Sequence, residues 1–260
     1  MNKITVITIC YNNLEDLIST CKSVDTQQSH PFEHWIIDGS SDKKIETFLT
    51  HNSQPSYRYW LCERDKGIAD AFNKGILRAK GDILVMLNSG DCFFDDTTIH
   101  LVSGAFFNDA NLMWLHGKYK ILRGGQWVII GKPFMKSKLY RGMRSVCHQT
   151  MFVKKTLHDK YGLYNVEEKI GMDYDFLCRI ASEKNTFINQ PMAVFAPEGT
   201  SSNNYFASLK DARRIYEKYY GKSYKLIFWQ MRLRALRIIL DSPVGKFLYN
   251  IKTKLGLENA

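Results

Sequence analysis

The side chains of this chain that could do chemistry are mostly carboxylates and amides, and they follow short apolar segments. Four such segments end in polar residues, which are Thr8 and Cys10, then Asp38, then Asp65, and finally Asn88 and Asp91. In an open α/β sheet, ligands bind beyond the carboxyl ends of the strands. If the four segments are strands of one parallel sheet, these polar side chains gather at one edge and form a binding site.

The chemistry that suits this acidic set is the binding of a nucleoside diphosphate through a divalent cation. Carboxylates repel a diphosphate unless a cation bridges the two, and hard oxygen ligands favour Mg²⁺ or Mn²⁺. The segment Leu87–Asp91 would hand a carboxylate to a turn at a strand end. The chain has neither G-x-G-x-x-G nor G-x-x-x-x-G-K-[ST], which argues against a dinucleotide-dependent dehydrogenase and against a P-loop enzyme.

The elements that must position these residues alternate between strands and helices. Four apolar runs predict strands, at residues 4–10, 34–38, 57–61 and 83–87. Helical spacing follows the first run at 14–24, and it follows the third at 68–79, where Gly81 is the predicted stop. Continuous apolar runs are typical of parallel strands covered on both faces. The order predicts an α/β fold with a mostly parallel central sheet.

The later part of the chain is less regular. Short β-like runs occur at 127–130 and 149–153, and a helix is predicted after Gly171. The six cysteines include no C-x-x-C pair, so we expect reduced thiols in a cytosolic protein. The apolar stretch at the N-terminus is too short for a secretory signal, and no window holds the roughly 18 apolar residues of a transmembrane helix. Any contact with a membrane would therefore be peripheral.

The net charge of +10 lies almost entirely at the end of the chain. Residues 1–200 hold 24 Lys and Arg against 22 Asp and Glu, whereas residues 201–260 hold 12 against 4. A basic segment of this kind points to an anionic partner, such as phospholipid, nucleic acid or a phosphorylated substrate.

The basic segment is also apolar at helical spacing. Its last part has one narrow apolar stripe, made by Val244, Phe247, Leu248, Ile251 and Leu255, with the lysines off the stripe. This pattern is typical of an interfacial amphipathic helix. For residues 224–240 two interpretations stay open, a helix that covers the rest of the protein and a helix that lies partly on lipid. We therefore predict a domain at 1–205 and a basic helical tail at 206–260 that binds an anionic membrane surface through 224–255.

Several segments together resemble the family 2 glycosyltransferases, particularly the bacterial ones of polysaccharide assembly. The matching segments are Val6–Asn12, Ile36–Asp42, Glu63–Gly75, Leu87–Asp91, Cys147-His148-Gln149 and Met172–Asp175. Each of them is common by itself, whereas the ordered set is specific. The resemblance implies a GT-A fold with a Rossmann-like nucleotide-binding domain, and a transfer that inverts the anomeric centre of the sugar.

The resemblance also implies roles for individual residues. For the donor nucleotide the predicted residues are Thr8, Cys10, Asp38, Asp65, Asn73 and Asn88. Asp91 would bind Mn²⁺ or Mg²⁺, and Asp173 would be the general base. His148, Gln149 and Asp175 would lie near the transferred sugar or the acceptor. Many relatives carry two or three carboxylates in the region of Asp91, whereas this chain has one, which predicts weaker metal binding.

Some of these residues have a second interpretation. Asp38 and Asp91 could be turn residues, Asp65 could cap the following helix, and Asn73 could be a solvated helix position. Of Asp173 and Asp175, one could cap the helix while the other is the base.

The predicted function is an inverting glycosyltransferase of the hexosyl or N-acetylhexosaminyl class. It would move a sugar from a nucleotide-sugar donor, with UDP as the default nucleotide, to a lipid-linked saccharide acceptor. The predicted location is the cytoplasm, at the inner face of the cell membrane, in surface polysaccharide biosynthesis. The alternatives are a catalytically inactive nucleotide-sugar sensor and a nucleic-acid-binding protein that uses the basic tail. We expect no nucleic acid, because no RNA-binding signature is present.

Overall fold

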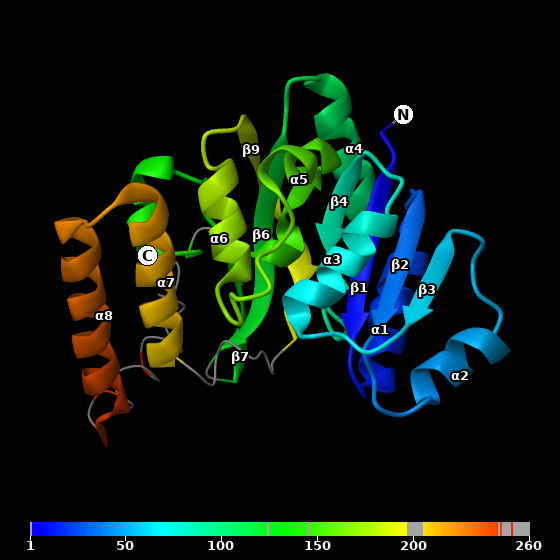
Figure 1. Ribbon diagram of the computed structural model, residues 1–260, viewed down its shortest axis with the longest axis horizontal. Helices are drawn as coiled ribbons and strands as arrows, with labels where there is room; N and C mark the ends of the chain where they lie inside the picture. Colours follow the sequence, from blue (N-terminus) through cyan, green and yellow to red (C-terminus); the bar gives the residue numbers. More distant parts are fainter. Residues whose placement is uncertain are drawn as a thin grey trace.

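The computed structural model describes residues 2–123, 125–144, 146–196 and 205–243, together with Gly245 and Ile251. Helices lie on both faces of a nine-stranded sheet (Figure 1). In the first half of the chain the elements are β1 (Ile4–Cys10), α1 (Leu14–Asp25), β2 (Glu33–Asp38), α2 (Lys44–His51), β3 (Arg58–Cys62), α3 (Ile68–Arg78), β4 (Ile83–Met86), β5 (Cys92–Phe93) and α4 (Thr98–Asn108).

The second half holds shorter and less regular elements. They are β6 (Trp114–Arg123), β7 (Gln126–Ile130), the 3₁₀ helices η1 (Lys136–Arg141) and η2 (His148–Thr150), β8 (Phe152–Lys154), α5 (Lys155–Tyr161), α6 (Met172–Ile180), β9 (Asn185–Val194), α7 (Tyr205–Tyr220) and α8 (Tyr224–Asp241). The run expected at 149–153 therefore divides between η2 and β8.

The strand order in the sheet is β3-β2-β1-β4-β8-β6-β9-β5, and β7 pairs with β6. The predicted parallel strands β3, β2, β1 and β4 are neighbours, so their carboxyl ends meet at one edge. Beyond β4 the sheet is mixed, because β8 enters antiparallel to both β4 and β6, while β6 and β9 are parallel. The predicted α/β class is confirmed, and its parallel part is the part that holds the first four polar turns.

Side-chain alternation divides the core between the two faces of the sheet. On one face, Ile7 of β1 packs in a cluster with Phe72 and Ile76 of α3 that extends to α6 and α7. On the other face, Val6 packs in a cluster with residues of α4, among them Val102. All of these side chains are almost fully buried. Because burial of each such side chain stabilises the fold by about 1.5–3 kcal/mol, both faces of β1 anchor the sheet.

The ends of α3 differ from the prediction. The helix ends at Arg78 with Ala79 as its C-cap, and Gly81 lies beyond it. Gly81 donates its backbone N–H to Thr5 Oγ1 at 3.2 Å, in a place where a side chain would overlap β1. Gly81 therefore allows the entry into β4 and is not the helix stop.

The C-terminal helices α7 and α8 lie at one end of the molecule, beyond α6 (Figure 1). Ile215 of α7 is buried in the core cluster of α6, and α8 buries Leu226, Gln230 and Leu233 at i, i+4 and i+7. The remaining surface of α8 is largely exposed. Helix α8 thus covers the protein with one narrow face, and the interpretation that residues 224–240 lie partly on lipid stays a prediction.

The apolar stripe of the last part of the chain lies, apart from Ile251, outside the described residues. Within the described residues, no helix has the length and apolar character required to cross a membrane.

Candidate active site

A cavity of about 740 Å³ opens at the carboxyl edge of the parallel strands. It is bounded by the turns after β1, β3 and β4, by the segment that leads into η2, and by the start of α6. The predicted site residues that line it are Cys10, Asp65, Asn88, Asp91, His148, Gln149 and Asp173. The lining thus brings together segments from both halves of the chain.

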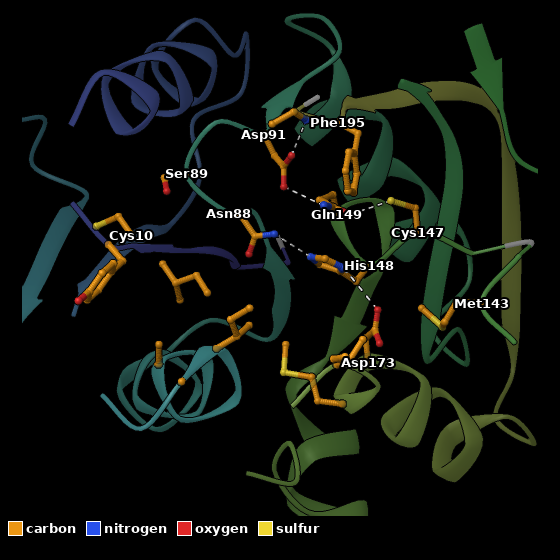
Figure 2. A pocket seen from close by; sticks show the side chains of 18 of the residues that line it. Cys10, Asn88, Ser89, Asp91, Met143, Cys147, His148, Gln149, Asp173 and Phe195 are labelled. Carbon is orange, nitrogen blue, oxygen red and sulfur yellow. Dashed lines mark hydrogen bonds and ion pairs between the residues drawn. The ribbon is translucent and has the colours of Figure 1, made fainter. Parts of the chain in front are cut away.

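The turn after β4 presents Asp91 to this cavity. Gly90 has φ of 94°, a left-handed conformation that a side chain would strain, and it turns the chain so that Asp91 faces inward. Asp91 Oδ2 accepts from Gln149 Nε2 and Asp91 Oδ1 accepts from the backbone N–H of Ala196, each at 2.8 Å (Figure 2). The carboxylate is only 2% exposed, and this burial raises its pKa although both hydrogen bonds oppose the shift.

His148 links the strand end to α6. Its Nε2 lies 3.2 Å from Asn88 Nδ2, and its Nδ1 lies 3.6 Å from Asp173 Oδ2 (Figure 2). The edge of Phe72 from α3 packs against the imidazole. One ring nitrogen thus faces the Asn88 amide and the other faces Asp173. The imidazole is thereby oriented toward the predicted base.

Asp173 itself lies in the first turn of α6. The helix begins after Gly171, which is the N-cap, and Asp173 Oδ1 accepts the backbone N–H of Tyr174 at 2.8 Å. The side chain is 24% exposed, and it faces the cavity. Its other oxygen, Oδ2, lies 3.6 Å from His148 Nδ1.

The turns after β2 and β3 lie against each other at the side of the cavity. Gly39 is required there, because a side chain at position 39 would overlap the Asp65 carboxylate. Asp65 Oδ1 accepts the backbone N–H of Gly67, which is the N-cap of α3, so Asp65 closes the turn and lines the cavity as well. Asp65 is therefore not the helix cap, and its carboxylate closes the turn before α3.

Asp38 and Cys10 sit deeper at this edge. Asp38 is 3% exposed, and its Oδ1 accepts the backbone N–H of Ser40 at 2.9 Å, so its side chain organises the turn and does not line the cavity. Burial and the neighbouring Asp38 raise the pKa of the Cys10 thiol, which therefore stays protonated. Cys10 offers the cavity a small neutral side chain.

Three predicted site residues turn away from the cavity into structural roles. Thr8 is fully buried and its Oγ1 lies 3.0 Å from Nε2 of His34. Asn73 exchanges two hydrogen bonds of 2.9 Å with the backbone of Tyr164 and so holds the loop that leads to α6. Asp175, which is 1% exposed, binds Arg179 and residues of α7. In each case the polar atoms of the side chain are engaged by the protein.

Other lining residues were not predicted from the sequence. Tyr11 stands at the cavity with 63% of its surface exposed, in a position that suits stacking on a flat ligand. Tyr119 and Ile121 on β6, and Phe195 beyond β9, form the far wall. Strand alternation could have paired Tyr119 with Ile121, but no sequence signal shows which face of β6 lines the cavity.

The family resemblance implies a divalent cation, and the oxygen atoms of this turn suit one. Asn88 Oδ1 is buried without a hydrogen-bond partner, and the Asn88 side chain neighbours the Asp91 carboxylate. Carboxylate and amide oxygens are ligands that Mg²⁺ and Mn²⁺ prefer. No group of three acidic, histidine or cysteine side chains in the described part of the chain could hold a metal by itself. Oxygen atoms of a bound diphosphate would have to complete the coordination.

The sequence as a whole supports the family assignment. The profile described as "Glycosyl transferase family 2" matches residues 5–162, which is more than half of the chain. The chain therefore belongs to glycosyl transferase family 2 and is a glycosyltransferase. An uncharacterized glycosyltransferase of Mycobacterium tuberculosis is 33% identical over 181 residues, which cover 68% of both chains. A PGL/p-HBAD biosynthesis glycosyltransferase of Mycobacterium bovis is 26% identical over 175 residues, covering 65% of this chain and 66% of the relative.

Solved structures support the predicted GT-A fold. The structure of Staphylococcus aureus TarS 1-349 in complex with UDP-GlcNAc matches 93% of this chain and 67% of its own, with a TM-score of 0.64 and 16% identity. The mannosyltransferase PcManGT of Pyrobaculum calidifontis, in complex with GDP-Man and Mn²⁺, matches 98% of this chain and 81% of its own, with a TM-score of 0.65 and 14% identity. At these identities the likeness concerns the fold.

Proposed function

We propose that this glycosyltransferase moves a hexosyl or N-acetylhexosaminyl group from a UDP-sugar to a hydroxyl group of a lipid-linked saccharide, with inversion. The observation that supports this best is the contact of His148 with both Asn88 and Asp173. It joins the strand end that would hold a diphosphate to the helix that carries a candidate base, across one cavity.

The nucleotide would lie over the turns after β1 and β3. Tyr11 and Asp65 line that side of the cavity, and Cys10 forms its floor. Thr8, Asp38 and Asn73 would act on the donor indirectly, because they hold the strand ends and the loop before α6. The two solved structures of similar fold contain UDP-GlcNAc and GDP-Man, and we take UDP as the nucleotide to test first.

Asp173 would be the general base. The oxygen of the acceptor hydroxyl forms a bond to the anomeric carbon, the bond from that carbon to the diphosphate breaks, and the hydroxyl proton passes to Asp173. A single displacement of this kind inverts the anomeric centre. His148, whose Nδ1 faces the Asp173 carboxylate, would hold that carboxylate in place. A positioned base contributes about 10²–10⁴-fold to the rate.

A divalent cation would be held by Asp91 and Asn88 together with the diphosphate. When bound, it would neutralise the negative charge that develops on the leaving group. Gln149 and the backbone of Ala196 keep the Asp91 carboxylate pointing at the cavity.

The acceptor would approach from a membrane. The exposed side chains of α8 combine apolar and basic residues, which are Tyr224, Lys225, Phe228, Met231, Arg234 and Ile238. Such a surface suits the interface of an anionic bilayer. This surface, together with a relative named for PGL/p-HBAD biosynthesis, supports a peripheral enzyme at the cytoplasmic face of the membrane that builds surface glycans.

The test is a thermal-shift panel of UDP-, GDP- and dTDP-sugars with and without Mn²⁺, followed by a transfer assay. A donor that binds the folded state raises the melting temperature. We expect a UDP-sugar to do so only with the cation, and we expect Asp91→Ala and Asp173→Ala to abolish transfer. Wild-type transfer by both variants would refute the proposed site. Donor binding without transfer or hydrolysis would identify a sensor instead.

A further inference from the structure

A group of arginines surrounds one tryptophan beside the cavity. The guanidinium carbons of Arg141, Arg144 and Arg232 lie 4.9, 5.2 and 5.4 Å from the ring centroid of Trp229 on α8. They come from η1, from the segment after η1, and from α8. Tyr140 meets the same indole edge-on, and its hydroxyl oxygen accepts from Arg141 Nε. Three separate segments thus deliver positive charge to one place.

In the described part of the chain, these three arginines are not paired with carboxylates. None of the three arginines forms an ion pair with a carboxylate in the part of the chain that the structure describes, although other arginines there do so. Burial lowers the pKa of Arg144, and the neighbouring Arg123 and Arg232 lower it further. Trp229 Nε1 is buried and, among the described residues, has no hydrogen-bond partner. The group therefore offers several donors and no negative charge.

Packing of α8 explains the tryptophan but not the arginines. A cation–π contact stabilises by about 0.5–1 kcal/mol at an exposed site, whereas several guanidinium groups around one ring repel one another. Apolar side chains at these positions would attach α8 equally well without that repulsion. An anion bound between the arginines would remove the repulsion.

The position of the group relates it to the cavity. Tyr119, Ile121 and Arg123 follow one another at alternate positions of β6, and the first two line the cavity. Alternate residues of a strand share one face, so Arg123 continues this wall outward. Met143 lines the cavity as well, and Arg144 follows it directly. The arginines therefore border the cavity on the side of α8.

We propose that Arg123, Arg141, Arg144 and Arg232 form a binding site for the phosphate groups of a membrane lipid, with the diphosphate of the lipid-linked acceptor as the occupant. Guanidinium groups bind phosphate oxygens through paired, charge-assisted hydrogen bonds. A saccharide held this way places its hydroxyl in the cavity and directs its lipid toward the exposed apolar residues of α8, among them Phe228. This inference rests on the lipid-linked acceptor of the proposed function.

The test compares three full-length proteins, which are the wild type, the double variant Arg144→Gln/Arg232→Gln, and the control Arg234→Gln. Arg234 lies on the same helix, is exposed, and makes no contact with Trp229 that the structure shows. Binding of farnesyl diphosphate is measured by calorimetry in EDTA, so that no cation can bridge the diphosphate to Asp91. Binding to phosphatidylglycerol vesicles is measured in parallel, with phosphatidylcholine vesicles as the neutral reference.

We expect the double variant to bind farnesyl diphosphate about a hundredfold more weakly, about tenfold for each guanidinium, which corresponds to about 1.4 kcal/mol each. The control should bind it as the wild type does. If the double variant bound phosphatidylglycerol vesicles more weakly but farnesyl diphosphate normally, the phosphate would come from a phospholipid headgroup. Equal binding of both probes by all three proteins would overturn the site, and so would a loss of farnesyl diphosphate binding per charge in the control equal to that in the double variant.

These outcomes do not depend on sugar transfer. Donor binding and transfer are measured with Asp91 and Asp173 variants, whereas phosphate binding is measured in the absence of donor. The arginine site can therefore fail while the proposed function holds, and the proposed function can fail while the arginines still bind phosphate. Because neither Arg144 nor Arg232 forms an ion pair with a carboxylate of the described residues, we expect all three proteins to unfold at the same temperature, which would exclude misfolding as the cause of weaker binding.

Discussion

The carboxylates of Asp173 and Asp175 should respond differently to the same substitution, one through activity and the other through stability. Asp175 is 1% exposed and ties α6 to α7, since its Oδ1 accepts from Lys218 and from the Tyr219 hydroxyl while its Oδ2 accepts from Arg179. Asp173 faces the cavity and accepts one backbone N–H. We predict that Asp175→Asn lowers stability, whereas Asp173→Asn lowers activity and leaves stability nearly unchanged.

The magnitude follows from the partners that each change leaves behind. In Asp175→Asn, the NH₂ group replaces one carboxylate oxygen. In either orientation of the amide it faces an N–H or O–H donor that it cannot accept from, and Arg179 loses its counter-charge. Breaking a buried ion pair costs about 3–5 kcal/mol. Lys218 is half-exposed and can turn to water, and Arg179 keeps the carbonyl oxygens of Gly162 and Leu163, so the lower end applies. About 3 kcal/mol corresponds to a fall in melting temperature of roughly 6–12 °C.

The assay pairs differential scanning calorimetry with sugar transfer under the same buffer conditions. For Asp173→Asn we expect a loss of about 10²–10⁴-fold in kcat and a change in stability within about 0.5 kcal/mol. An unchanged melting temperature in Asp175→Asn would show that the buried network is not a structural tie. A large fall in the melting temperature of Asp173→Asn would show that this carboxylate is structural as well.

Further predictions concern pH, the histidine of the site and the cation. Burial lowers the pKa of His116 to about 4 and that of His158 to about 3, so below about pH 6.5 the unfolded chain binds protons that the folded chain does not. The stability of the fold should therefore decrease as the pH falls from about 6.5 toward 4. His158→Phe can keep the stacking on Phe176 and should make the melting temperature depend less on pH in this range. His148→Gln should lower kcat by up to about 10²-fold with the KM of the donor unchanged, because Asp173 loses its orienting contact, and a higher KM alone would contradict this role. EDTA should abolish transfer, and Mn²⁺ or Mg²⁺ should restore it in the wild type but not in Asp91→Ala; full activity in EDTA would show that no metal is used.

The parallel part of the fold could be predicted because local signals agreed there. The strand expected at residues 4–10 and the strands expected at 34–38, 57–61 and 83–87 occur within one residue at each end. The apolar runs of β1, β2 and β4 are buried on both faces, so their pattern is strong, whereas β3 at the sheet edge leaves Tyr59 and Trp60 exposed. The second half gave weaker signals, because β8 holds only three residues and runs antiparallel between β4 and β6. Strand pairing of that kind depends on distant contacts and not on local composition.

The candidate site shows the same division. Residue type and position at strand ends pointed to Asn88 and Asp91, and both line the cavity. Local sequence did not separate Asp173 from Asp175, because one turn of α6 carries both carboxylates and only the packing of α7 buries one of them. Asn73 was misplaced for a similar reason. Its helix face is turned toward the backbone of Tyr164, far away in the sequence.

By itself, the sequence determined the class of the protein and the chemistry of its parts. The apolar runs and the polar residues that end them specify parallel strands with acids at one edge, because burial and turn formation are local preferences of the residues concerned. Only the tertiary structure decided which side chains meet. The contact of His148 with Asn88 and Asp173, and the arginines around Trp229, join segments separated by many residues, and such contacts exist only once the sheet and its helices have packed.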